Sequence, residues 1–305
     1  MATVKKSKKV PFAKKVVNYV GRKVDLSTGK LVYGNTAGLK HNFRGDRDRS
    51  RNKTGLDTFS DDPRVKQLTD TGILPLGTPY DKELISTLQS KYNKMIEDDR
   101  YSFIKFQHEG KVYSRMLYMA FKNFREVGEL LTDDIKNLIK GRYQSNFQVT
   151  HVMCWRNYHA PAEMLGGKEI FSNRWHCDHS NTAIEKLFVN LSDVTEDDGP
   201  FHIMSRSRTK EIIKMGFGDR KNYQLDKNIL EDPKYITKAT GPAGSALLCN
   251  TELCFHRADI PVEGHSRDLI QFKFVPSKEP LHDDWLDRIE GNNREIDPDN
   301  NPANT

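Results

Sequence analysis

The chain has 305 residues, of which 36% are hydrophobic and 30% charged, with a net charge of +6. This length suits one large domain or two small ones. No apolar run reaches the roughly 18 residues of a membrane-spanning helix, and the N-terminus lacks the apolar core and cleavage site of a secretory signal, so we expect a cytoplasmic protein without a transmembrane segment.

Most of the positive charge lies at the N-terminus. Residues 1–30 carry nine Lys or Arg and one Asp, so the rest of the chain sums to −2. Few large apolar residues occur in 1–62, which predicts a basic, largely extended arm. Five residues within it have the spacing of a basic amphipathic helix: Val10, Ala13, Val17, Val20 and Val24. The arm could be solvated, dock on its own domain, or contact an anionic membrane or nucleic acid, and the sequence leaves these alternatives open.

The first part of the folded domain, which we place at 63–276, is mainly helical. A short strand is predicted at 72–76, followed by a helix that begins at Pro79. A second helical stretch is expected at 118–131, and a third is expected to begin after Thr132 as its N-cap.

From residue 147 the hydrophobic period changes to two, which is typical of strands. The predicted strands are 147–155, 186–192, 201–204, 245–249 and 268–275. Helices followed by several short strands predict an α+β, mainly β fold, built on a double sheet or jelly roll with the N-terminal helices packed on one sheet.

Two long segments, 160–174 and 205–240, interrupt the strand pattern, and we expect them to form the lid and rim of a site. Residues 277–305 are predicted to be a polar C-terminal tail. The second interruption contains four basic residues, Arg206, Arg208, Lys210 and Lys214. A cationic rim would suit an acidic or phosphorylated small-molecule substrate. A solvated helix face explains the same residues, and both interpretations stay open.

His176 and Asp178 are separated by one residue in a segment that reads as extended. Because alternate strand residues point to the same face, both side chains can reach one metal ion while Cys177 points away. A second histidine, His256, follows a later predicted strand. Two histidines and one carboxylate are the ligand set of non-haem Fe(II) oxygenases, so we predict that these three residues bind iron.

Two other groups contain metal-binding residue types. His282-Asp283-Asp284 repeats the His-x-Asp pattern in a polar stretch, where we interpret it as a solvated surface or helix start. Cys249, Cys254 and His256 could form a zinc site, but no CxxC pair supports this. Buried free thiols are therefore the preferred interpretation of the four cysteines.

Arg267 opens an apolar strand eleven residues after His256. The strand pattern places Arg267, Leu269 and Gln271 on one face and Ile270 and Phe272 on the other. A guanidinium at this position could bind a carboxylate through two parallel hydrogen bonds.

Four motifs together resemble the phytanoyl-CoA dioxygenase family of Fe(II)/2-oxoglutarate oxygenases. The resemblance covers about residues 64–276. The motifs are Gly72-Ile-Leu-Pro-Leu with the helix that follows it, Trp175-His-Cys-Asp178, the acidic turn Leu191-Ser-Asp-Val-Thr-Glu-Asp-Asp-Gly-Pro-Phe201, and Gly241-Pro-Ala-Gly-Ser-Ala-Leu-Leu248 before the distal histidine.

The resemblance implies a double-stranded β-helix in which His176, Asp178 and His256 bind Fe(II) and Arg267 pairs with the distal carboxylate of 2-oxoglutarate. With O2 as co-substrate, such an enzyme hydroxylates a C–H bond and releases succinate and CO2. Relatives place an aromatic wall near Phe188. Two further candidates for contacts to the co-substrate, at the end of the preceding strand, are Asn157 and Tyr158.

The resemblance also narrows the reaction, because related halogenases lack the metal carboxylate that Asp178 supplies here, so oxygenation is expected. An alternative of another class remains: a non-catalytic double-stranded β-helix whose basic arm contacts nucleic acid or membrane.

Overall fold

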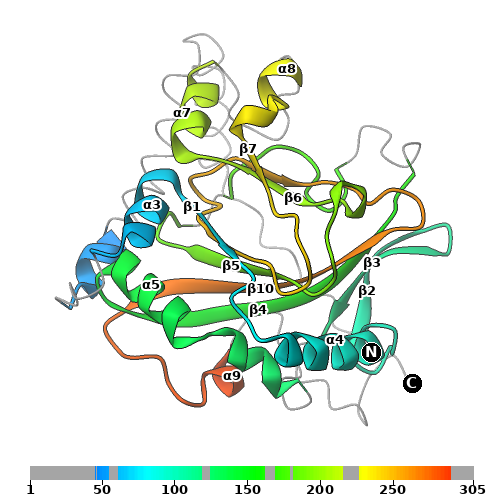
Figure 1. Cartoon of the computed structure of the whole chain (residues 1–305), viewed down its shortest axis with the longest axis horizontal. Helices are drawn as coiled ribbons and strands as arrows, with labels where there is room; N and C mark the ends of the chain where they lie inside the picture. Colours follow the sequence, from blue (N-terminus) through cyan, green and yellow to red (C-terminus); the bar gives the residue numbers. More distant parts are fainter. Residues whose placement is uncertain are drawn as a thin grey trace, which may run out of the picture.

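Two antiparallel sheets face each other in this computed structural model, and helices cover the outer face of the larger sheet (Figure 1). The described residues are 45, 47–54, 61–118, 124–161, 169–178, 181–215 and 227–289. This arrangement is the α+β jelly roll that the sequence predicted, with its N-terminal helices on one sheet.

Within the described residues, the large sheet has seven strands and the small sheet has three. In spatial order the large sheet consists of β1 (Ile73–Gly77), β8 (Ala246–Cys249), β5 (Glu185–Asn190), β10 (Ser266–Ser277), β4 (Asn146–Tyr158), β3 (Lys111–Leu117) and β2 (Ser102–His108). The small sheet consists of β7 (Ile236–Lys238), β6 (Phe201–Met204) and β9 (His256–Ala258).

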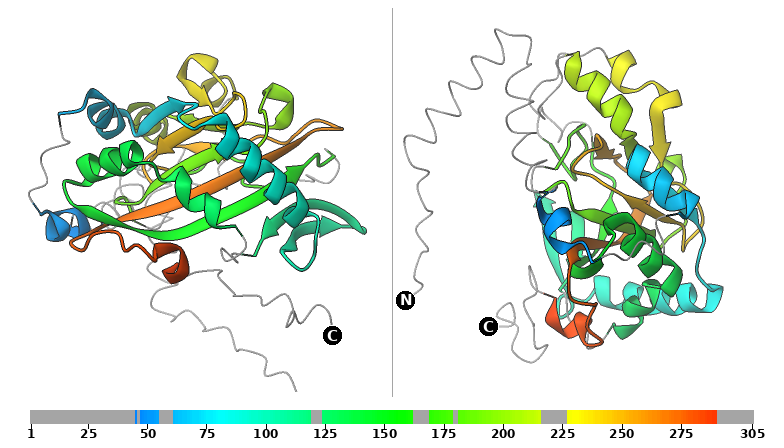
Figure 2. Two further views of the ribbon diagram at one scale, coloured as in Figure 1. Left: turned by 60° about the horizontal axis from the view of Figure 1, so that its bottom comes forward. Right: turned by 90° about the vertical axis from the view of Figure 1, so that its left-hand side faces the viewer.

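The main hydrophobic core lies between the large sheet and the helices. These helices are α3 (Pro63–Thr71), α4 (Lys82–Ile96), the 3-10 helix η3 (Arg125–Leu130) and α5 (Asp133–Tyr143). Figure 2 shows α4 and α5 lying across this face of the sheet. Thr132 is the N-cap of α5, as predicted, because its side chain accepts a hydrogen bond from the Ile135 amide. The Tyr143 hydroxyl at the other end of α5 donates to the Phe274 carbonyl at 3.0 Å, which ties this helix to β10.

Helices α7 (Arg206–Lys214) and α8 (Lys227–Leu230) belong to the other side of the molecule. Ile212 and Leu230 from this region pack with Met204 and Phe255 on the outer face of the small sheet. Short 3-10 helices, η4 (Glu196–Asp198) and η5 (Pro233–Tyr235), lie in the connections. No helix within the described ranges is long and apolar enough to cross a membrane.

A bulge in β4 changes the side-chain pattern that the sequence predicted for this strand. Lys273 pairs with His151 but the next residue of β10 pairs with Val149, so Thr150 is an extra residue. The simple alternation predicted Phe147, Val149, Met153 and Trp155 on one face. Instead the first two of these residues enter the helix-side core, whereas Met153 and Trp155 line a cavity between the sheets.

The region before α5 also differs from prediction. The expected helical stretch at 118–131 is the shorter η3, and residues 119–123 lie outside the described ranges. The hairpin of β2 and β3, which is joined at Glu109 and Gly110 with φ of 49° and 78°, was not predicted from the sequence. Two positive φ values are typical of a two-residue hairpin turn, so Gly110 was the available signal.

Both ends of the predicted domain continue into packed segments. Residues 47–52 are helical, and the Asn181 side chain donates to Asp48 at 2.6 Å. In the segment predicted as a polar tail, α9 (Trp285–Arg288) packs Trp285 and Leu286 against the main core. The possible amphipathic helix at 10–24 lies outside the described residues, so its role stays a prediction.

Candidate metal centre

The His176–Asp178 segment is held against β9 by backbone hydrogen bonds. The amides of His176 and His256 each donate to the carbonyl of the other residue, at 3.1 and 2.9 Å. The Asp178 amide donates to the Thr251 carbonyl at 3.0 Å. This extended pairing directs His176 and Asp178 to the cavity, while Cys177 enters the core on the outer face.

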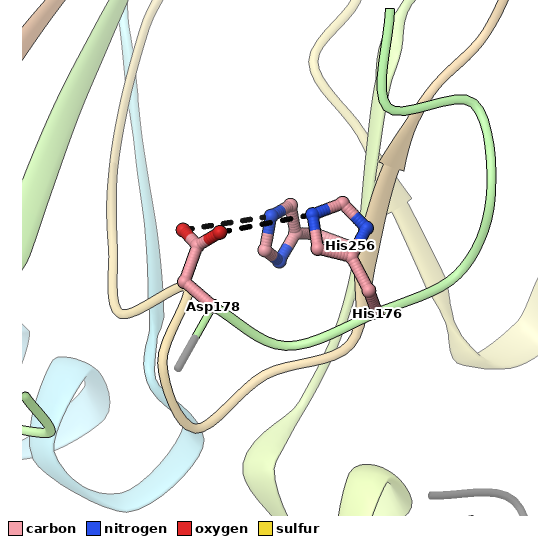
Figure 3. A group of neighbouring side chains, drawn as sticks. All are labelled: His176, Asp178 and His256. Atoms are coloured by element: carbon pink, nitrogen blue, oxygen red, sulfur yellow. Dashed lines mark ion pairs between the residues drawn. The ribbon is translucent and has the colours of Figure 1, made fainter. Parts of the chain in front are cut away.

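His176, Asp178 and His256 converge on one point (Figure 3). Their possible ligand atoms all lie within 4.8 Å of one another. The Nε2 atoms of His176 and His256 lie 3.7 and 3.8 Å from the two carboxylate oxygens of Asp178. In the described part of the chain, this is the one group of three such residues close enough to share a metal ion, so Cys249 and Cys254 do not form the alternative zinc site.

The backbone fixes which nitrogen each histidine offers. His176 Nδ1 lies 2.7 Å from the Arg174 carbonyl, and His256 Nδ1 lies 3.1 Å from the Cys254 carbonyl. A carbonyl can only accept, so each Nδ1 carries the proton and each Nε2 keeps a lone pair directed to the shared point. Metal-bound histidines are commonly oriented in this way.

The protonation states of the triad also suit a metal. Burial lowers the pKa of His256 to about 3, and the neighbouring His176 adds to the effect. Burial opposes ionisation of Asp178, but His256, Lys186 and Thr251 outweigh it and hold the pKa of this carboxyl well below its usual value. Neutral imidazoles and an ionised carboxylate are the forms that bind metal ions.

Two residues that were not predicted from the sequence orient Asp178. Lys186 Nζ and Thr251 Oγ1 both donate to Asp178 Oδ2, at 2.6 and 2.7 Å. Lys186 is two residues before Phe188 on β5, so the strand alternation could have placed it in the site. Thr251 lies in an irregular turn, and no sequence pattern indicated its contact.

The triad lines a cavity of about 440 Å³ between the two sheets, and Arg267 reaches the same cavity from β10. Only 2% of Arg267 is exposed. Its Nε and Nη1 atoms have no hydrogen-bond partner among the described residues, and neither has Nε2 of Gln271 on the same strand face. Burial lowers the pKa of Arg267 to about 10, so its guanidinium remains charged at neutral pH. The cavity therefore contains an unsatisfied cation and further unpaired donors, an arrangement that suits an anionic ligand.

The remaining predicted residues fall on different faces. Phe188 lines the cavity and stacks on Phe201 with ring centroids 4.6 Å apart. Asn157 also lines it and accepts a hydrogen bond from the Ser114 hydroxyl at 2.8 Å. The prediction that Tyr158 contacts the co-substrate needs correction. Tyr158 follows Asn157 on the strand and therefore points to the other face, where its hydroxyl donates to Glu97 at 2.7 Å.

The predicted cationic rim is corrected as well. Arg208 is buried, stacks 3.9 Å from the Tyr235 ring centroid and donates to Glu211. None of the described residues of 205–240 lines the cavity. In the other segment that interrupts the strand pattern, 160–174, residues 169–172 line the cavity, and residues 162–168 lie outside the described ranges. The second His-x-Asp copy is exposed at His282, as expected for a solvated segment.

All four cysteines are buried and free, which confirms the preferred interpretation of these residues. Burial raises the pKa of the Cys177 thiol well above its ordinary value. Such a thiol stays protonated and is a poor nucleophile or metal ligand.

No protein-family model matches the sequence, and no curated protein matches it. Solved structures do share the fold. The non-heme alpha ketoglutarate dependent epimerase SnoN from nogalamycin biosynthesis aligns with a TM-score of 0.51 and 10% identity, over 70% of this chain and 82% of that one.

Two further structures align similarly. The non-heme alpha ketoglutarate dependent carbocyclase SnoK has a TM-score of 0.51 and 12% identity, over 76% of this chain and 92% of that one. EctD from S. alaskensis, solved in its apoform, has a TM-score of 0.50 and 13% identity, over 70% of this chain and 76% of that one. At such low identity these similarities establish the fold, and the function must be argued from the site.

Proposed function

We propose that this protein is an Fe(II)- and 2-oxoglutarate-dependent oxygenase, of the phytanoyl-CoA dioxygenase type, that hydroxylates a C–H bond of a small molecule. One observation carries the proposal: the buried, unpartnered guanidinium of Arg267 lines the same cavity as the convergent triad. A metal site alone would suit many proteins. The added carboxylate-binding group favours a metal that works with an anionic co-substrate.

The donor set fits Fe(II). Two neutral imidazoles and one carboxylate bind iron and leave coordination positions open for other ligands. His176, Asp178 and His256 would hold the ion, and Lys186 with Thr251 would keep the carboxylate in its present orientation. Because both orienting groups donate to Oδ2, Oδ1 is the oxygen left for the metal.

Arg267 and Gln271 would hold the co-substrate. A guanidinium offers two parallel donors to a carboxylate, and burial strengthens such charge-assisted bonds. Phe188, Phe201 and Leu269 line the same cavity and give it an apolar wall. Together with 2-oxoglutarate and O2, the bound iron would supply the oxidising power for C–H hydroxylation, with release of succinate and CO2. Asp178 occupies the ligand position that halogenases leave for chloride, so we propose oxygenation as the outcome.

Anaerobic titration of the full chain with Fe(II) and then 2-oxoglutarate tests the proposal. We expect a weak visible absorption band from the metal and the chelating co-substrate. His176→Ala should abolish the band, whereas His282→Ala, in the exposed second His-x-Asp copy, should leave it intact. A wild-type chain that binds neither Fe(II) nor 2-oxoglutarate would contradict the proposal, as would a band that survives His176→Ala.

A further inference from the structure

Lys105 is directed to the cavity by a β-bulge in β2. Ile104 pairs with Arg115 and Phe106 pairs with Ser114, so Lys105 is an extra residue between two consecutive pairs. Both Lys105 and Phe106 line the cavity, which consecutive residues of a regular strand cannot do because their side chains alternate. Bulges near functional sites commonly redirect a side chain in this manner.

The Lys105 ammonium has no acidic partner in the described part of the chain. Its Nζ lies 5.8 Å from the ring centroid of Trp155, which also lines the cavity. Lys105 as a whole is exposed to solvent, yet the atoms packed around its ammonium lower the pKa of this group, and no carboxylate acts in the opposite direction, although Glu169 lines the same cavity. A cation that has an aromatic ring as its partner, and no ion pair among the described residues, can bind an anion in the cavity without breaking an existing contact.

The surroundings of Lys105 are apolar and aromatic. Met153 and Trp155 line the cavity from β4, and Phe106 meets Phe171 edge to face with ring centroids 6.1 Å apart. Phe171 has φ of 55°, in the left-handed region that bulky residues rarely adopt. The 3.0 Å bond from the Ile170 amide to the Asn173 side chain is part of the turn that holds it there. Such strain is tolerated where a side chain must be placed for function.

We propose that Lys105 binds an anionic group, a carboxylate or a phosphate, on a substrate whose apolar body lies against Trp155, Met153 and Phe171. This inference rests on the proposed function for the chemistry that follows binding, but the subsite itself can be tested without turnover. It replaces the cationic residues of α7 as the proposed source of selectivity for acidic substrates, because none of the described side chains of α7 lines the cavity.

Calorimetric titration of four small probes into the full chain tests this subsite. The probes are phenylacetate, phenyl phosphate, the neutral phenylacetamide and the cationic phenethylamine. Ni(II) and 2-oxoglutarate are kept saturating so that the anions cannot occupy the triad or Arg267. At least one anion should bind roughly three- to tenfold more tightly than the amide, as one solvent-screened ionic contact provides. The two anions distinguish a carboxylate from a phosphate preference.

Three variants test whether Lys105 causes the tighter binding of the anionic probes. Lys105→Met should remove it while leaving the amide affinity unchanged, and Lys105→Arg should retain most of it. Lys111→Met is the matched control, because Lys111 on the same hairpin also stacks on an aromatic ring, 5.7 Å from the Tyr113 centroid, but does not line the cavity. Equal binding of anion and amide, tighter binding of the amine, no binding of either anion, or an anion preference that survives Lys105→Met rejects the subsite.

The visible band of the Fe(II) and 2-oxoglutarate complex, recorded on the same samples, separates the two claims. If the band is absent while Lys105-dependent anion binding persists, the proposed function fails and the subsite stands. If the band is present in wild type and in Lys105→Met but no anion preference exists, the subsite fails and the proposed function stands.

Discussion

Replacing Arg267 with Met should stabilise the ligand-free protein and weaken co-substrate binding. Burial lowers the pKa of Arg267 to about 10 from an ordinary value near 12.5, so the folded state disfavours this charge by about 3 kcal/mol. Its Nε and Nη1 atoms gain no hydrogen bond from the described residues in return. Methionine fills much of the same space without a charge, so we expect the free energy of unfolding to rise by about 1–3 kcal/mol.

The same change should weaken 2-oxoglutarate binding by roughly a hundred- to a thousandfold, because two charge-assisted hydrogen bonds are lost. Urea denaturation of the metal-free chain measures the first effect, and anaerobic titration with 2-oxoglutarate in the presence of Fe(II) measures the second. Arg267→Lys, which keeps the charge without the fork geometry, should fall between wild type and Arg267→Met in affinity. A variant that is less stable than wild type and binds 2-oxoglutarate equally well would refute the assignment of Arg267.

Three further predictions address the metal ligand, a turn and the pH dependence. Thr251→Val should weaken Fe(II) binding about 10- to 100-fold in equilibrium dialysis, because the ligand carboxylate loses an orienting donor; Thr251→Ser should not. Gly72 has φ of 76°, and an added Cβ would lie 2.5 Å from the Cys254 sulfur, so Gly72→Ala should cost about 2–4 kcal/mol in urea denaturation. Gly77, with φ of 64° and open space around it, is the matched control and should cost about 1 kcal/mol when changed to Ala; equal costs would contradict the clash. Burial lowers the pKa of His202 in the folded state to about 3, so the unfolded state binds this proton first as pH falls. The stability that a neutral His202 contributes is therefore complete above about pH 6.5 and is lost as pH falls toward 3, by about 2 kcal/mol between pH 7 and 5. In urea denaturation, His202→Gln should lose less stability between pH 7 and 5 than the wild-type protein does. A pH dependence equal to that of the wild type would contradict the role given to His202.

The sequence predicted the jelly roll, the triad and Arg267, and strand periodicity could assign the faces of these side chains because it is a local property. Alternation along β10 separated Arg267 and Gln271 from the apolar residues that face the helices, and the structure has the same separation. His176 and Asp178 followed from the same two-residue period. In each case a regular extended segment was enough to assign the face of a side chain.

Irregular backbone explains most of what could not be predicted. An extra residue at Thr150 switches the face of β4, and another at Lys105 turns that side chain toward the cavity. Whether a strand contains a bulge depends on its pairing with neighbouring strands, which one segment of sequence does not specify. The contact of Thr251 with Asp178 joins residues 73 positions apart, through a turn that no periodic pattern describes.

We propose above all that His176, Asp178 and His256 hold one iron ion beside a carboxylate bound by Arg267. A crystal grown without oxygen and soaked with Fe(II) and 2-oxoglutarate, with data collected at the iron absorption edge, tests it most directly. We predict one anomalous peak between the two Nε2 atoms and the Asp178 carboxylate, with electron density for a dicarboxylate that extends from the metal to Arg267. An iron peak at His282 or at the cysteines, or 2-oxoglutarate bound away from Arg267, would contradict the claim.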